Sequence, residues 1–233
     1  MNEQLDKAFD ALKTYDWGMD PNSIKAVDDA IVATHTDAAA RKELEARLIA
    51  ALATEAPRAA KDAVCRALKT IGTAAAVPAL AALLADDKLS HMARYALERI
   101  PGPEAGQALR ESLPKVAAKL KIGVLSSLGA RGEATALTAP MTALLADGDA
   151  AVAVAAAHAV GDIGSLEAAK VLLTAKAAAG SKAAIADASM NCAEQLLAAG
   201  NKGAAKITYD KVLAGAPSKL IKDAATRGLT ACK

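Results

Sequence analysis

The sequence predicts an all-α fold, a right-handed α-solenoid of about seven stacked antiparallel helical hairpins. Three observations lead to this prediction. Of the 233 residues, 53% are hydrophobic and only 2% are aromatic, so the core would consist of small and aliphatic side chains, chiefly the helix formers Ala and Leu. Hydrophobic residues recur at the period of a helix. The pentapeptide ALLAD occurs twice, at residues 82–86 and 143–147, which indicates an internal repeat.

Residues 1–36 are predicted to form an N-terminal capping hairpin. Phe9, Tyr15 and Trp17 lie here, and a second helix is expected to begin near Asp20 and Pro21. An end unit lacks one stacking neighbour, so large aromatic side chains that close its open face suit this position. The other interpretation is that these aromatic residues clamp a ligand.

Residues 37–180 are predicted to contain the repeats, because four helix-like segments end on a large apolar residue followed by Gly or Pro-Gly. The glycine accepts the left-handed conformation that often closes a helix. These stops are Ile71-Gly72, Ile100-Pro101-Gly102, Leu128-Gly129 and Ile163-Gly164. The residues three positions before the last apolar residue are Leu68, Leu97, Leu125 and Val160. Apolar residues also stand four, eight and eleven positions before it, so one apolar stripe is written four times. Its one clear exception is seven positions before the last apolar residue, where Lys121 stands in place of an apolar side chain.

Another helix is expected ahead of three of these segments, at residues 74–85, 104–112 and 133–146. The turns between partners contain Asp86-Asp87 and Asp147-Gly148-Asp149, and aspartate is a good N-cap for the helix that follows. The two ALLAD copies would then be the same helix end in two units.

The segment VPALAALLAD at 77–86, followed by MARYAL at 92–97, resembles HEAT repeats, in particular the short bacterial kind also called PBS-lyase-like. The resemblance covers residues 41–179 and implies that the second helix of each hairpin lines a concave side. It specifies an architecture and no activity. Residues 181–233 are predicted to form C-terminal hairpins, because Gly200, Ala205, Tyr209 and Pro217 fall at tetratricopeptide spacing. All three segments would form one continuous domain.

The composition disfavours several classes of partner. The 28 basic and 26 acidic residues leave a net charge of +2, without the basic stripe of a nucleic-acid binder. No apolar run approaches the about 20 residues of a membrane span. The start, MNEQLDKAFD, lacks the pattern of a signal peptide. We expect a cytoplasmic protein if this is the native N-terminus, and a periplasmic or secreted one if a signal peptide was removed.

No catalytic signature is found, and we predict that the protein is no enzyme and holds no cofactor or metal. The three cysteines are too widely spaced for a zinc motif. Iron-dependent hydroxylases with HEAT-like architecture carry His-Glu pairs, whereas His35, His91 and His158 are followed here by Thr, Met and Ala.

The remaining candidate is a binding surface. Positions five, six and nine before each stop face away from the apolar stripe, and Arg and Tyr there are the residue types that contribute most at protein interfaces. The candidate residues are Asp62, Arg66, His91, Arg94, Tyr95, Lys119 and His158. An ordinary solvated helix face is the competing interpretation, and His158, set among alanines, is expected to be a partly buried packing residue.

The function predicted from this surface is a non-catalytic scaffold that binds a protein or peptide. The alternative is a lyase-like or accessory subunit that holds a small molecule or pigment. The chain is expected to be a monomer, or a piece of a larger protein. Weak self-association through the C-terminal end is a further expectation, because Leu220, Ile221 and Leu229 leave apolar surface there.

Overall fold

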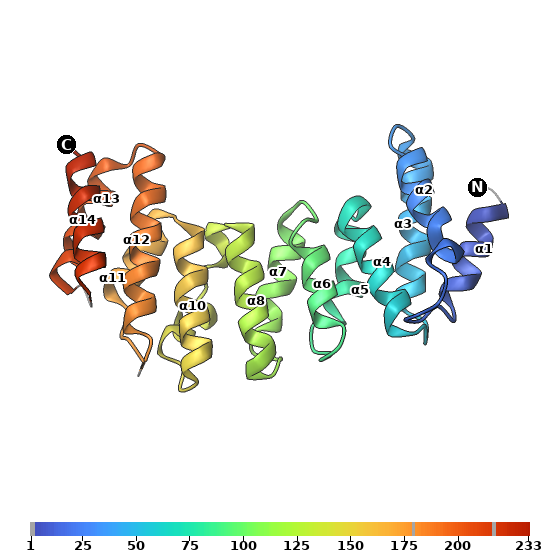
Figure 1. Ribbon diagram of the computed structural model, residues 1–233, viewed down its shortest axis with the longest axis horizontal. Helices are drawn as coiled ribbons and strands as arrows, with labels where there is room; N and C mark the ends of the chain where they lie inside the picture. Colours follow the sequence, from blue (N-terminus) through green and yellow to red (C-terminus); the bar gives the residue numbers. More distant parts are fainter. Residues whose placement is uncertain (1–2, 179, 216–217) are drawn as a thin grey trace. The chain divides into compact units, whose positions relative to one another are not determined.

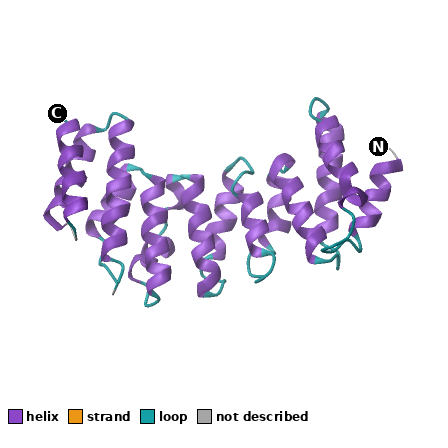
Figure 2. Cartoon of the chain, in the orientation of Figure 1, coloured by secondary structure: helices purple, strands orange, loops and turns teal. Residues whose placement is uncertain are grey.

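The computed structural model describes residues 3–178, 180–215 and 218–233, and these residues confirm the predicted all-α fold. They contain fourteen α-helices and four 3-10 helices and no strand (Figure 2). The chain divides into two compact units, Met1–Ser112 and Leu113–Lys233, which are described in turn. The segment boundaries expected at residues 36 and 180, and the sense of the superhelix, stay predictions.

Unit 1 is a stack of short helices in which each helix contacts the next one or the next but one. Its elements are α1 (Glu3–Leu12), η1 (Pro21–Ile24), α2 (Lys25–Ala33), α3 (Ala38–Leu52), α4 (Arg58–Ile71), η2 (Ala74–Ala76), α5 (Val77–Ala81), α6 (Ser90–Leu97) and α7 (Pro103–Ser112). Helix α4 packs on α3 and on α6, and α5 packs on α7 (Figure 1). First helices therefore contact first helices and second helices contact second helices, as in a repeat stack.

Unit 2 is built in the same way. Its elements are α8 (Ala118–Arg131), η3 (Ala134–Ala136), α9 (Ala139–Ala143), η4 (Leu144–Ala146), α10 (Ala150–Ile163), α11 (Leu166–Thr174), α12 (Lys182–Ala198), α13 (Lys202–Gly215) and α14 (Lys219–Ala231). Helices α8, α10 and α12 stand side by side, α10 in the middle, and α12, α13 and α14 follow in sequence (Figure 1). Tyr209 is buried, while Pro217 of the tetratricopeptide-like spacing lies outside the described residues.

The apolar stripe forms the core of both units. The residues three positions before the stops, Leu68, Leu97, Leu125 and Val160, are all fully buried. Burying such a side chain contributes about 1.5 to 3 kcal/mol, so this stripe supplies much of the stability of short helices that would not form alone.

The two ALLAD copies have the same structural role. The second leucine of each copy, Leu84 or Leu145, is buried. The Asp86 carboxylate accepts hydrogen bonds from the backbone N–H groups of Lys88 (2.7 Å) and Leu89 (3.0 Å), and the Asp147 carboxylate accepts one from Asp149 (2.9 Å). The pentapeptide therefore places one leucine in the core and turns the chain toward the next helix.

The prediction that a left-handed glycine closes each of these four helices is correct at Gly164 and wrong at the other three stops. Gly164 has a φ value of 61°, in the left-handed region, and caps α10. Gly102 has a φ value of 93° but does not close a helix, because α6 already ends at Leu97. Gly72 has φ of −63°, and Gly129 lies inside α8, which ends at Gly132 instead. A Cβ on Gly129 would lie 3.1 Å from the Ala159 Cα, so a small residue is needed there for contact with α10.

Two predicted helices are shorter than expected. Residues 74–85 form only η2, α5 and a turn, and residues 133–146 are divided into η3, α9 and η4. Pro78 and Pro140 each stand in the first turn of their helix. Proline lacks the N–H group that a helix interior needs, so each helix begins at the residue before its proline instead of running through it.

Candidate functional site on helices α4 and α6

Three of the candidate residues in unit 1 lie at the surface of the neighbouring second helices α4 and α6. Arg66 and His91 are exposed, and Tyr95 is 37% exposed. The ammonium of Lys69 on α4 donates a hydrogen bond to the Tyr95 hydroxyl on α6 at 2.5 Å, and it lies 4.0 Å from the centre of the Tyr95 ring. This pair ties the two helices together and leaves an aromatic ring at the surface beside positive charge.

Asp62 differs from the prediction, because its side chain is buried rather than turned to solvent. Its Oδ2 atom lies 3.7 Å from the Arg58 Nε, and its Oδ1 atom is buried without a hydrogen-bond partner among the described residues. Burial raises the pKa of the carboxyl, against the opposing charges of Arg58, Arg66 and His91. Cys65 stands three residues after Asp62, so the two side chains lie on the same side of α4, and both are buried.

Arg94 is half-buried, so it contributes less surface than a free arginine on a helix. Burial lowers the pKa of its guanidinium, and the nearby Glu98 carboxylate opposes this effect. The exposed part of the site therefore consists of Arg66, His91 and Tyr95, with Lys69 as a member that the sequence analysis missed. No sequence signal marks Lys69, because its partner Tyr95 lies on another helix.

Two predicted site residues belong to unit 2. Lys119 is exposed on α8, and His158 is exposed on α10. The expectation that His158 is partly buried is wrong. Ala156, Ala157 and Val160 carry the buried side of α10, and position 158 points away from it. The candidate residues of unit 1 therefore form a group of their own on α4 and α6.

The N-terminal aromatic residues do not act together as a cap. Phe9 and Tyr15 are half-buried, but Trp17 is 67% exposed in the loop after α1. The guanidinium of Arg47 on α3 lies 4.0 Å above the Phe9 ring. Phe9 and Arg47 line a pocket. The sequence analysis did not predict this pocket, although it offered a ligand clamp as the other interpretation of the aromatic residues in this segment.

Two of the three cysteines are buried in the core. Burial raises the pKa of Cys65 to about 12 and that of Cys192 to about 11, so neither thiol is a nucleophile near neutral pH. Within residues 3–178, 180–215 and 218–233, no three His, Cys, Asp or Glu side chains gather as metal ligands would. In the same residues, no helix combines the length and apolar character that crossing a membrane requires.

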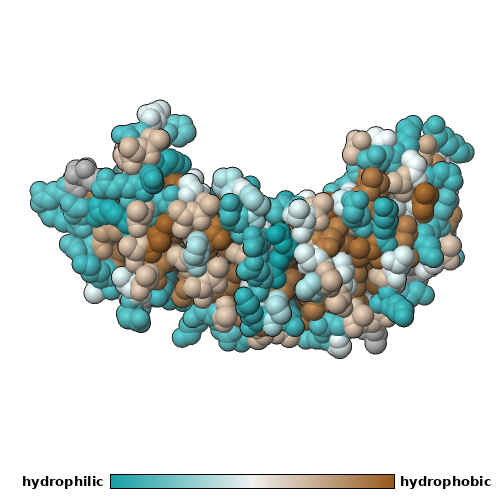
Figure 3. Space-filling model, turned by 180° about the vertical axis from the view of Figure 1, so that it is seen from behind, coloured by the Kyte–Doolittle hydropathy of each residue, from teal (hydrophilic) through white to brown (hydrophobic). Residues whose placement is uncertain are grey.

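Apolar residues reach the surface between polar ones within each unit (Figure 3). The large exposed ones are Trp17, Met19, Val32 and Tyr95 in unit 1, and Ile122, Leu166, Ile207 and Leu220 in unit 2. Of these residues, Tyr95 combines ring exposure with a fixed position, because Lys69 holds it. Such a ring loses little conformational freedom when a partner binds.

The fold and the site define an all-α helical-repeat protein that presents side chains from consecutive helices. No protein-family model matches the chain, and no curated protein matches it. Among solved structures, human deoxyhypusine hydroxylase in complex with glycerol is similar over 99% of this chain and 96% of that chain. The identity is 14% and the TM-score is 0.34, values at which the similarity says nothing about activity or ligands.

Proposed function

We propose that this protein is a non-catalytic scaffold of the HEAT-repeat type, which binds a protein or peptide through the exposed face of α4 and α6. The observation that carries the proposal is the partly exposed Tyr95, which Lys69 holds in place, with exposed Arg66 one turn before Lys69 on α4. Tyrosine and arginine combine apolar area with hydrogen-bonding groups and dominate the energy of many protein interfaces.

The charges on this face indicate the chemistry of the partner. Lys69 places positive charge next to the Tyr95 ring, exposed Arg66 lies one turn before Lys69 on α4, and Asp62 on the same helix is buried. A partner segment with an acidic residue and an apolar or aromatic neighbour complements this arrangement, since the acid meets the cations and the apolar group packs on the ring.

The test compares proteins captured from source-cell lysate by three forms of the chain, after chemical cross-linking. The site variant is Arg66→Glu/Tyr95→Ala. The matched control is Lys42→Glu/Trp17→Ala, which reverses one exposed charge and removes one exposed aromatic ring elsewhere in unit 1. Circular dichroism melts check that all three forms are folded.

We expect the wild type and the control to enrich the same protein. The site variant should capture at least about tenfold less of that protein. The captured protein is then remade pure, and its acidic segment is titrated against the three forms. Equal capture by the site variant and the wild type would show that this face is an ordinary solvated surface.

A second candidate function, an accessory subunit that holds a small molecule or pigment, is favoured by one observation. A pocket with a volume of about 430 Å³ lies between α1, α3 and α4 of unit 1. This volume falls within the range of about 300 to 1,000 Å³ that is typical of small-molecule sites.

A further inference from the structure

The pocket between α1, α3 and α4 has a largely apolar wall. It lies entirely within unit 1 and has a volume of about 430 Å³. Its apolar lining residues are Phe9, Leu12, Ala50, Ala51, Ala56, Ala60 and Val64. Because most of these side chains are small, the space next to the Phe9 ring stays open instead of being filled by the protein itself.

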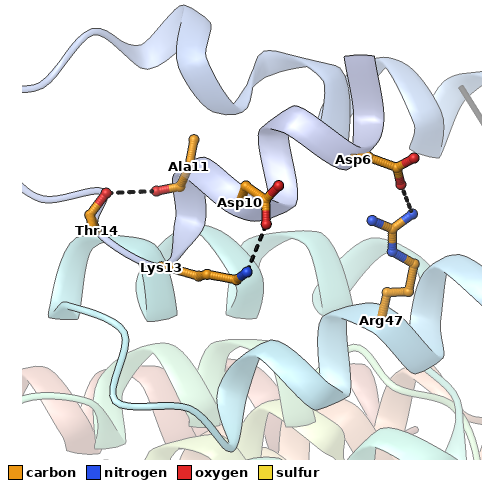
Figure 4. Close-up of polar contacts among 6 residues, drawn as sticks. All are labelled: Asp6, Asp10, Ala11, Lys13, Thr14 and Arg47. Atoms are coloured by element: carbon orange, nitrogen blue, oxygen red, sulfur yellow. Dashed lines mark hydrogen bonds and ion pairs between the residues drawn. The ribbon is translucent and has the colours of Figure 1, made fainter. Parts of the chain in front are cut away.

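The two carboxylates at the pocket are already paired with cations (Figure 4). Asp6 on α1 lies 2.8 Å from the guanidinium of Arg47 on α3, and Asp10 lies 2.7 Å from the ammonium of Lys13. The hydrogen bond from Lys13, and then its charge, lower the pKa of Asp10, so this carboxylate stays ionised. Neither acid is therefore available to attract a cationic ligand.

Lys61 is the third cation that lines the pocket. It is half-buried in the first turn of α4, and its ammonium makes no hydrogen bond or ion pair with the residues that the structure describes. The lining contains three cationic side chains, Lys13, Arg47 and Lys61, and the two carboxylates of Asp6 and Asp10. It therefore has one positive charge in excess. An unpaired ammonium on a half-buried side chain beside an apolar wall is best complemented by an anion with an apolar body.

We propose that this pocket binds a small amphipathic monocarboxylate, whose carboxylate meets Lys61 and whose apolar body packs against Phe9 and the alanines of α3 and α4. A lysine ammonium is a compact single charge, which suits one carboxylate. The guanidinium of Arg47 is engaged by Asp6 and by the Phe9 ring, so the forked donor that phosphate groups favour is occupied. The proposal does not depend on the partner surface of α4 and α6.

The test is a titration of ¹⁵N-labelled protein with decanoate, followed by NMR. Decan-1-ol, which has the same chain without the charge, is the matched ligand. Lys61→Gln removes the unpaired ammonium, and Lys88→Gln, at an exposed lysine outside the pocket, is its control. Ala50→Phe fills the pocket from an exposed position on α3 and leaves all charges in place.

We expect decanoate to shift the amide signals of residues 6–13, 47–54 and 60–64 in a saturable way, and to bind at least about tenfold more tightly than decan-1-ol. Lys61→Gln should lose about tenfold in affinity, Ala50→Phe should abolish the shifts, and Lys88→Gln should bind like the wild type. Three results would each overturn the proposal: no shifts up to about 1 mM decanoate, equal binding of decan-1-ol, or unchanged binding by Lys61→Gln or Ala50→Phe.

Discussion

At the scale of single residues, the most unusual group in unit 1 is the Asp62 carboxylate. Among the residues that the structure describes, its buried Oδ1 atom has no hydrogen-bond partner, and the Arg58 Nε at 3.7 Å from Oδ2 is too distant for a hydrogen bond. A buried ionised group without good partners lowers the stability of the folded state. The protein therefore retains Asp62 at some cost in stability.

The first prediction concerns the pH dependence of this cost. The folded state raises the pKa of Asp62 above 3.8, so the folded form binds the proton more tightly than the unfolded form. As the pH rises from about 4 to 7, ionisation of Asp62 should therefore lower the free energy of unfolding of the wild type. Asp62→Asn cannot ionise, so its stability relative to the wild type should increase over the same range.

Urea unfolding of both proteins across this pH range measures the effect. The sign of the change is the decisive quantity, because the Asn substitution also alters local hydrogen bonds by an amount that does not vary with pH. A stability difference that is flat, or that falls as the pH rises, would contradict the burial of the ionised carboxyl.

The second prediction concerns the thiols. Cys65 and Cys192 are buried and have raised pKa values, whereas Cys232 is half-exposed near the end of α14. At about pH 8 the native protein should react rapidly with Ellman's reagent at one thiol only, because the thiolate is the reacting species. In urea all three cysteines should react. Cys232→Ser should abolish the rapid phase; if it persists, one of the two core thiols is accessible.

At the scale of elements, the second helices of unit 2 approach closely where both carry small residues. Gly129 of α8 lies against Ala159 of α10, and Gly161 of α10 lies against Ala188 of α12. Glycine inside a helix costs about 1 kcal/mol in propensity relative to alanine. At these two positions the close helix contact compensates for this cost.

The third prediction tests that compensation by adding one methyl group at two glycines. A Cβ at position 161 would lie 2.8 Å from the backbone of Ala188, so Gly161→Ala should destabilise unit 2 by about 1 to 3 kcal/mol. Gly203 lies in α13 with open space around it, so Gly203→Ala should be neutral or stabilise by about 0.5 kcal/mol. Urea melts compare the two variants. A stabilising effect of Gly161→Ala would show that α10 and α12 are farther apart than described.

At the scale of the whole molecule, stability is built from contacts between neighbouring helices. Within unit 1, α6 contacts α4, α5 and α7, and within unit 2, α12 contacts α10, α11, α13 and α14. In repeat proteins each element depends mainly on its neighbours, so a local defect should weaken nearby helices most.

The fourth prediction follows from this dependence. Leu97 of α6 is fully buried, so Leu97→Ala should cost about 2 to 5 kcal/mol, while Arg99→Ala at an exposed position should change stability by at most about 0.5 kcal/mol. In Leu97→Ala, the rate of amide hydrogen exchange, measured by mass spectrometry and compared with the wild type, should rise more in α4 to α7 than in α12 to α14. A uniform rise along the chain would instead indicate a single cooperative unit.

The sequence by itself determined the all-α class, the repeated helices, the buried stripe through Leu68, Leu97, Leu125 and Val160, and the role of ALLAD. These features are local, because the helical period specifies which side of each segment is apolar and Asp caps only the residues that follow it. The same local logic identified Arg66, His91 and Tyr95 as surface residues.

Only the tertiary structure decided which outward residues meet a neighbour. The contact of Lys69 with Tyr95 and the pocket around Phe9, Arg47 and Lys61 join residues of different helices, and the charge of His91 on α6 acts on the buried Asp62 of α4. Such contacts depend on the rotation of each helix about its axis and on the distance to the next helix, which side-chain sizes at the whole interface set together. A periodic pattern in one segment carries no information about either quantity.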